Sequence, residues 1–188
     1  MRLDHALERA MAVPGTCVPR EVAWLYRAAY AAPTGTQWVE LGTYLGRTLI
    51  ALAAAAQERK AWVVSIDDYS YHEPCTIEQV RRNLTAAGLA SCDAAPKVTL
   101  VQGNSRDVPA LIGKVGLLFV DSHHVREHFD AEMKAWLHRV VPGGIVACHD
   151  YGSARWPEIT GGVKAWLDNP CYERMGLVRR LIVYRRLA

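Results

Sequence analysis

Short apolar runs alternate with helical patterns along this chain. Six runs are mostly apolar and rich in β-branched residues, as strands buried on both faces of a sheet should be: Gln37–Leu41, Trp62–Ile66, Val98–Val101, Gly116–Val120, Ile145–Cys148 and Leu181–Tyr184. Apolar residues at helical spacing predict a helix packed on the sheet, with one face formed by Val125, Phe129, Met133, Leu137 and Val140. This alternation predicts an α/β fold, a doubly wound, Rossmann-like, three-layer sandwich with a mostly parallel sheet.

The two ends of the chain depart from this alternation. The segment "GLVRRLIVYRR" leaves little room for a crossover helix, so the C-terminal strand is expected to run antiparallel to the others. At the other end, Leu3, Leu7 and Met11 have the spacing of an amphipathic helix. Residues 1–35 are therefore expected to form a helical cap over a pocket or a homodimer interface, and residues 36–188 the main domain. The sequence does not separate these two roles.

Composition narrows the class of protein. A length of 188 residues suits one main domain, and shares of 51% hydrophobic and 22% charged residues are typical of a soluble globular protein. The alanine-rich stretch Leu49–Ala56 is too short to span a bilayer, and the N-terminus lacks the apolar centre of a signal peptide. We therefore expect a cytoplasmic protein with no membrane association. The five cysteines include no C-x-x-C pair, which argues against a cysteine zinc site.

Charge adds little to this picture. A net charge of +3 is too small to favour a nucleic-acid partner, so we expect none. Positive charge near the C-terminus is expected to lie on a solvated strand edge formed by Arg179, Arg180, Arg185 and Arg186.

Two glycines interrupt the first apolar run and the helix that should follow it, in "WVELGTYLGRTLIAL". If the first strand is Gln37–Leu41, Gly42 and Gly46 lie in the first strand-to-helix turn, where a ligand can approach the backbone closely. Their G-x-x-x-G spacing is not the G-x-G-x-x-G of dinucleotide sites, and no P-loop lysine follows. Asp67 ends the next predicted strand, where a carboxylate can accept hydrogen bonds from a ribose. The two features together indicate a nucleoside-containing ligand.

Four segments resemble the class I S-adenosylmethionine-dependent methyltransferases: "VELGTYLGRT", "VVSIDDY", "VQGNSRDVPAL" and "GLLFVDSHHVREHFDAEMKAWLHRVVPGGIVACHDYG". The last is similar to the small O-methyltransferase branch that includes macrocin and catechol O-methyltransferases. The resemblance spans roughly residues 36 to 187. It implies that S-adenosylmethionine is bound by Glu40, Gly42, Gly46, Thr48, Asp67, Ser105 and Asp121. Glu40 would support the amino-acid end, Asp67 the ribose and Ser105 the adenine. Carboxylates also suit a cationic sulfonium better than they suit a pyrophosphate.

A second group of polar residues comprises Asp121, His149 and Asp150, which follow neighbouring predicted strands and should meet at the carboxyl edge of the sheet. In metal-dependent members of the resembled branch, corresponding positions hold magnesium, so the resemblance implies a magnesium site here. His149 departs from the usual oxygen ligands, because imidazole suits manganese, iron, zinc or nickel better than magnesium. The alternative is a metal-free site in which His149 and Asp150 orient the substrate.

Histidines near Asp121 are candidates for proton transfer. His123 lies where related enzymes often carry Asp, and an imidazole that titrates near neutrality can accept the hydroxyl proton during methyl transfer. We therefore predict Asp121 and His123 as catalytic residues, with a substrate-positioning role as the alternative for His123. His124 and His128 share i, i+4 spacing, but without an adjacent glutamate they are expected to be solvated or to serve the helix start.

These observations predict a methyltransferase that O-methylates a small-molecule hydroxyl on a phenolic, sugar or other natural-product acceptor. Aromatic walls for that acceptor are expected from Tyr69, Tyr71 and Trp156. One alternative is a metal-dependent hydrolase built on Asp121, His124, His128 and His149. Another is a protein that binds the cofactor without transferring a methyl group.

Overall fold

The computed structural model describes residues 1–70, 75–89, 97–109 and 112–188, so the predicted wall residue Tyr71 lies outside the described residues. A seven-stranded sheet has the order β3-β2-β1-β4-β5-β7-β6. Its strands are β1 (Gln37–Leu41), β2 (Trp62–Asp67), β3 (Lys97–Gln102), β4 (Val115–Val120), β5 (Val140–Cys148), β6 (Tyr172–Val178) and β7 (Leu181–Arg186). Strands β1 to β5 pair in parallel, and β7 runs antiparallel to both of its neighbours. The predicted Rossmann-like fold with an antiparallel C-terminal strand is confirmed.

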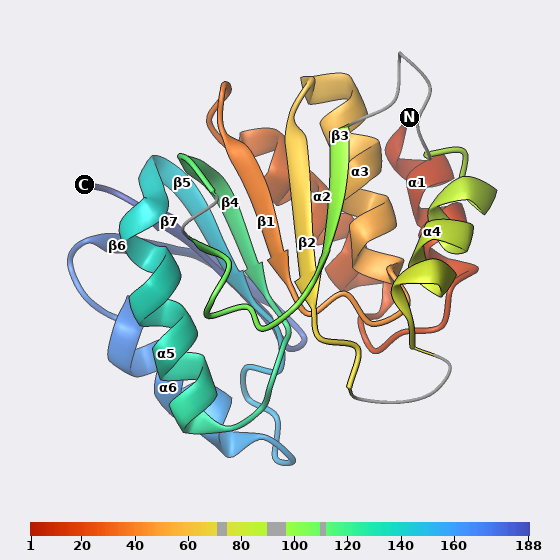
Figure 1. The fold of residues 1–188 in the computed structure, drawn as a ribbon. Helices are drawn as coiled ribbons and strands as arrows, with labels where there is room; N and C mark the ends of the chain where they lie inside the picture. The colour runs from red at the N-terminus through yellow and green to blue at the C-terminus, as the bar shows by residue number, and fades with distance from the viewer. Residues whose placement is uncertain (71–74, 90–96, 110–111) are drawn as a thin grey trace.

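Helices cover both faces of this sheet (Figure 1). One layer contains α1 (Leu3–Met11), α2 (Pro19–Ala31), α3 (Arg47–Arg59) and α4 (Ile77–Ala86), and the other contains α5 (Arg126–Trp136) and α6 (Pro157–Leu167). Neighbouring residues of β1 belong to different apolar clusters, since Trp38 packs with the first layer and Val39 with the second. Burial on both faces explains why the parallel strands are apolar without alternation.

The N-terminal helices share a core with the main sheet. Ala6 of α1 and Leu25 of α2 lie in the same buried cluster as Leu49 and Ala53 of α3. The small alanine side chains of α3 allow α1 and α2 to approach it closely. Among the described helices, none has both the length and the apolar character needed to cross a bilayer.

Two details differ from the sequence prediction. Val140 was expected on a helical face, but α5 ends at Trp136, a 3-10 turn follows, and Val140 begins β5. Strand β6 was not predicted, because it is a half-exposed edge strand without a continuous apolar run. Its pairing with β7 places Arg179 and Arg180 in the connecting turn. They are exposed, as expected, but they occupy a turn at the carboxyl edge of the sheet and not a strand edge.

Candidate active site

A cavity of about 760 Å³ opens at the carboxyl edge of the parallel strands, which is where ligands bind in open α/β sheets. We divide it into a β1–β3 half, lined by the loops after β1, β2 and β3, and a β4–β7 half, lined by the loops after β4 and β5 and the β6–β7 turn. Four predicted cofactor residues line this cavity: Gly42, Asp67, Ser105 and Asp121. The other three lie behind it: Glu40, Gly46 and Thr48.

Gly42 allows two strand ends to approach each other. Its φ is +89°, and a Cβ atom built on it would lie 2.1 Å from the backbone carbonyl oxygen of Asp121. Its N–H donates to the carbonyl of Ile66 at 2.9 Å. The sequence attributed this glycine to close approach by a ligand, whereas the structure gives it a further reason, the tight contact between the ends of β1 and β4. Gly46 also has a φ of +89° and immediately precedes α3.

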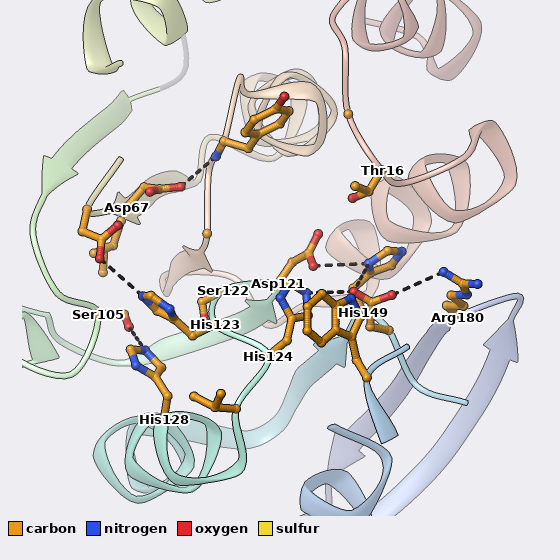
Figure 2. A pocket seen from close by; sticks show the side chains of 18 of the residues that line it. Thr16, Asp67, Ser105, Asp121, Ser122, His123, His124, His128, His149 and Arg180 are labelled. Carbon is orange, nitrogen blue, oxygen red and sulfur yellow. Dashed lines mark hydrogen bonds and ion pairs between the residues drawn. The ribbon is translucent and has the colours of Figure 1, made fainter. Parts of the chain in front are cut away.

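The Asp67 carboxylate holds the glycine loop. Its Oδ2 accepts hydrogen bonds from the N–H groups of Thr43 at 2.7 Å and Tyr44 at 2.8 Å, and its Oδ1 accepts from Tyr69 N–H at 2.6 Å. The same carboxylate faces the cavity (Figure 2). Asp67 therefore fixes the loop whose residues form the floor of the β1–β3 half. Its predicted contact with a ribose remains a prediction.

Glu40 belongs to a buried polar chain beneath this loop. Ser65 Oγ donates to Glu40 Oε2 and lies 2.6 Å from Thr43 Oγ1, while Thr48 contributes a further hydrogen bond to the carboxyl. Burial raises the pKa of Glu40 to about 8, because it outweighs the lowering by the hydrogen bonds from Ser65 and Thr48, and the nearby carboxylates of Asp121 and Asp67 add a smaller increase. Its Oε1 is buried without a hydrogen-bond partner among the described residues.

Three predicted metal ligands converge in the β4–β7 half, as Figure 2 shows for Asp121 and His149. His149 Nδ1 lies 3.2 Å from Asp121 Oδ1 and 3.6 Å from Asp150 Oδ2. Burial by itself lowers the pKa of His149, but the charge of Asp121 and hydrogen bonds with Asp121, Asp150 and Cys17 outweigh it and raise that pKa far above its ordinary value. His149 is therefore cationic at neutral pH when no metal ion is bound.

Sequence reasoning missed two residues that the N-terminal segment contributes. Cys17 Sγ lies 3.9 Å from Asp121 Oδ2, and Glu21 Oε2 lies 3.5 Å from His149 Nε2. Burial raises the pKa of the Cys17 thiol to about 12, so it is protonated without a metal. Neither residue lies in a motif of the sheet, and only their position in the fold reveals them.

The donor atoms can be grouped into two sets that could hold a divalent ion. Within the described residues, Cys17, Asp121 and His149 form one set and Asp121, His124 and Asp150 the other, with the donor atoms of each set within 4.8 Å of one another. Asp121 belongs to both. Mixed carboxylate, imidazole and thiol donors suit zinc, iron or manganese better than magnesium. The donor chemistry therefore fits a divalent ion and shifts the expected metal away from magnesium.

Two consecutive histidines point into different halves of the cavity (Figure 2). His123 Nε2 lies 3.3 Å from Asp68 Oδ2, after β2, whereas His124 Nε2 lies 2.9 Å from Asp150 Oδ2, after β5. The His124 ring also stacks on Trp156 with 4.4 Å between ring centroids. Hydrogen bonds from His124 and His149 outweigh the effect of burial and lower the pKa of Asp150. His124 precedes α5, but it is not solvated as the sequence suggested.

His128 belongs to a separate buried network. It lies 3.2 Å from Glu132 Oε1 and 3.3 Å from Ser105 Oγ, and both Ser105 and Ser122 donate to the Glu132 carboxylate. The expectation that His128 is solvated is wrong, because helix α5 carries it beneath the loop after β3. Its imidazole does not join Asp121 and His124, so the four-residue set of the hydrolase alternative is not assembled.

Comparisons with known proteins agree with this geometry. The family described as a methyltransferase domain matches residues 39–151, more than half of the chain. The O-methyltransferase NovP has 18% identity and a TM-score of 0.73, with 90% of this chain and 81% of NovP covered. The apo TDP-rhamnose 3'-O-methyltransferase CalS11 of calicheamicin biosynthesis has 19% identity and a TM-score of 0.69, covering 88% of this chain and 77% of its own.

A third similar structure contains a bound cofactor product. The Podospora anserina methyltransferase PaMTH1, solved with SAH bound, has 15% identity and a TM-score of 0.72, with 99% of this chain and 88% of PaMTH1 covered. At such identities these three structures establish a shared fold, while the family match over residues 39–151 identifies the domain itself. The chain belongs to the methyltransferase domain family.

Proposed function

We propose that this protein transfers the methyl group of S-adenosylmethionine to a hydroxyl of a small molecule. The observation that carries the proposal is a single cavity in which the glycine loop with Asp67 faces the Asp121–Asp150 pair. In-line displacement at a sulfonium methyl needs the donor and the acceptor side by side in one site. NovP is an O-methyltransferase and CalS11 is a TDP-rhamnose 3'-O-methyltransferase, which supports a hydroxyl acceptor.

The β1–β3 half is suited to the cofactor. The carboxylates of Asp67 and Asp68 line it, the His123 imidazole lies beside Asp68, and the buried Glu40 lies behind the loop. A cation is favoured beside the carboxylates of Asp67 and Asp68. S-adenosylmethionine, which carries a sulfonium and an ammonium, therefore fits this half. When bound, it supplies the electrophilic methyl group.

The β4–β7 half is suited to the acceptor hydroxyl. Asp121, Asp150 and His149 would hold a divalent ion there, and such an ion would supply Lewis acidity that lowers the pKa of a hydroxyl. The buried Glu21 would orient the far nitrogen of His149, since its Oε2 lies 3.5 Å from Nε2. These side chains hold the acceptor oxygen while the β1–β3 half presents the methyl group.

A histidine takes the hydroxyl proton in this proposal. His123 is the base predicted from sequence, but its Nε2 faces Asp68 in the β1–β3 half. His124 lies on the acceptor side, where Asp150 can accept its Nε2–H and leave Nδ1 free to bind the proton. The geometry therefore favours His124, because a carboxylate orients its ring and stabilises the imidazolium that forms.

Labelled methyl transfer tests the proposed function. The protein is incubated with S-[methyl-¹³C]adenosylmethionine and a panel of phenolic, sugar and amine compounds, and the products are identified by NMR. An O-methyl signal from at least one hydroxyl compound is expected, with no product from the matched compound that lacks the hydroxyl. Transfer only to amines would contradict O-methylation, and cofactor binding without any transfer would favour a binding protein.

A further inference from the structure

Three arginines line the β4–β7 half, and the proposed methyl transfer gives them no role. Arg155 lies in the loop between β5 and α6, and Arg179 and Arg180 form the turn between β6 and β7. Among the described residues that line the cavity, they are the only arginines, and no lysine joins them. Two segments that are distant in sequence thus bring three positive charges to one side of the cavity.

The backbone of the β6–β7 turn is fixed at this position. Arg180 N–H donates to Glu21 Oε1 at 2.9 Å, and Arg180 C=O accepts from Tyr151 N–H at 3.0 Å. Glu21 is itself buried. Arg179 has a φ of +53°, in the left-handed region that residues other than glycine seldom adopt. Such strain persists where surrounding contacts enforce it, often beside a binding site. The two guanidinium groups therefore extend from a rigid base.

The guanidinium groups retain free donors. Arg180 Nη1 lies 3.7 Å from Asp150 Oδ1, which is too long for a hydrogen bond, and its side chain is 57% exposed. Arg155 lies over the Trp156 ring, 4.8 Å from the centroid. Neither the Arg155 nor the Arg179 side chain has a hydrogen bond or ion pair with another described residue. Each guanidinium carries five N–H donors, so all three can bind a ligand.

The cofactor is not the ligand that these arginines suit. Its sulfonium and ammonium groups are cations that the guanidinium charges would repel, and its one carboxylate belongs to the amino-acid end, which is expected beside Glu40 and the glycine loop in the other half of the cavity. The planar guanidinium instead matches carboxylate and phosphate groups, which accept paired N–H bonds. The arginines also lie beside Asp150, His124 and Trp156, on the side that we assign to the acceptor. An anionic group on the acceptor would give the three arginines a ligand.

We propose that the acceptor carries an oxyanion group, a phosphate or a carboxylate, bound by Arg155, Arg179 and Arg180 while its hydroxyl lies at Asp121 and Asp150. This inference rests on the proposed methyltransferase function and specifies its substrate class. Binding the anion at the turn and the hydroxyl at the strand ends would orient the acceptor along the β4–β7 half. A neutral phenol or sugar would leave the three arginines without a ligand.

The test measures anion binding by the metal-free protein. Metal ions are first removed with a chelator, and the chelator is then removed by dialysis. Wild type is titrated by calorimetry with inorganic pyrophosphate and, separately, with malonate, each with and without SAH. The variant combines Arg155→Gln, Arg179→Gln and Arg180→Gln. Its matched control is Arg174→Gln, an exposed arginine of β6 that does not line the cavity. Stronger binding of pyrophosphate or of malonate shows which oxyanion the arginines prefer.

The triple variant is expected to lose about tenfold or more in affinity for the preferred anion, while Arg174→Gln stays within about twofold of wild type. SAH affinity should be the same in all three proteins. Equal anion affinity in wild type and the triple variant would overturn the inference. Tight, salt-sensitive RNA binding that the triple variant loses would also overturn it, in favour of a nucleic-acid acceptor. Absent SAH binding in wild type would contradict the proposed function instead.

Discussion

The two halves of the cavity are assembled in different ways. In the β1–β3 half, consecutive pieces of chain hold each other, since Asp67 binds the N–H groups of Thr43 and Tyr44 directly across the β1–β2 pair. In the β4–β7 half, Glu21 of α2 reaches His149 after β5 and Arg180 before β7. One half is a local strand-loop-helix unit, and the other exists only once distant segments meet. Fold and cofactor site can therefore be read from local sequence more readily than acceptor chemistry.

The largest expected effect comes from disturbing the contact between the halves. Gly42→Ala should lower the free energy of unfolding by on the order of 3 kcal/mol or more, because its Cβ would overlap the Asp121 carbonyl oxygen at 2.1 Å and its φ is +89°. Gly35→Ala is the control, since its φ of +71° is similar but nothing lies within 4 Å of the added carbon. Urea unfolding measures both. Equal losses would show that the close approach of β1 and β4 is unimportant.

A reciprocal pair of carboxylate variants separates the halves functionally. Asp150→Asn should lower turnover on the order of a thousandfold while SAH affinity stays within about threefold, because Asp150 serves only the acceptor side. Asp67→Asn should weaken SAH binding by about tenfold, because the loop loses its charged anchor. Calorimetry and steady-state kinetics check both variants. A large loss of SAH affinity in Asp150→Asn would contradict the division of the cavity.

Substitution of His123 or His124 compares the two halves of the cavity as sources of the proton acceptor. His124→Gln should lower turnover by about a hundredfold, because the amide keeps a hydrogen bond to Asp150 but cannot accept the hydroxyl proton. His123→Gln should lower it by less than about threefold, since its ring faces Asp68. The pH dependence of kcat identifies the base, because its loss removes one ionisation from the profile. The reverse order of effects would restore His123 as the proton acceptor.

Glu40, behind the β1–β3 half, makes the stability of the protein depend on pH. Its folded-state pKa of about 8 exceeds the ordinary value of 4.5, so the folded protein keeps a proton that the unfolded chain loses. Stability from this group is therefore present below pH 4.5 and is lost as the pH rises to about 8. Glu40→Gln removes that ionisation, so its stability relative to wild type should rise by about 3 kcal/mol between pH 6 and pH 9. Calorimetric melting at pH 6 and pH 9 checks it, and an equal difference at both would contradict it.

Much of the fold could be predicted because buried parallel strands have a strong pattern. Strand β1 and the antiparallel direction of β7 follow from apolar runs and connection length. Strand β6 could not be predicted, because its residues are half exposed and its role depends on pairing with β7. The missed strand matters for function, since it brings Arg179 and Arg180 to the carboxyl edge.

The site residues that could be predicted from the sequence are those that lie directly at the ends of predicted strands. Gly42 and Asp67 lie at strand ends that the pattern marks, and both line the cavity. Cys17 and Glu21 carry no such signal, since their roles arise from the packing of α1 and α2 against α3 and from the turn before α2. His124 was expected to be solvated or to serve the helix start, and its contact with Asp150 could not be predicted because it joins loops that follow two different strands.

Binding of SAH by the wild-type protein shows whether the cavity holds the methyl donor's product. An isothermal titration with SAH, and a parallel titration with NAD⁺, compares a ligand with a single ribose and an amino-acid tail with one that carries a pyrophosphate. We predict measurable SAH binding and at least about tenfold weaker NAD⁺ binding, because Asp67 and Asp68 repel an anionic pyrophosphate. NAD⁺ binding tighter than SAH binding would contradict the assignment of the cavity to methyl transfer.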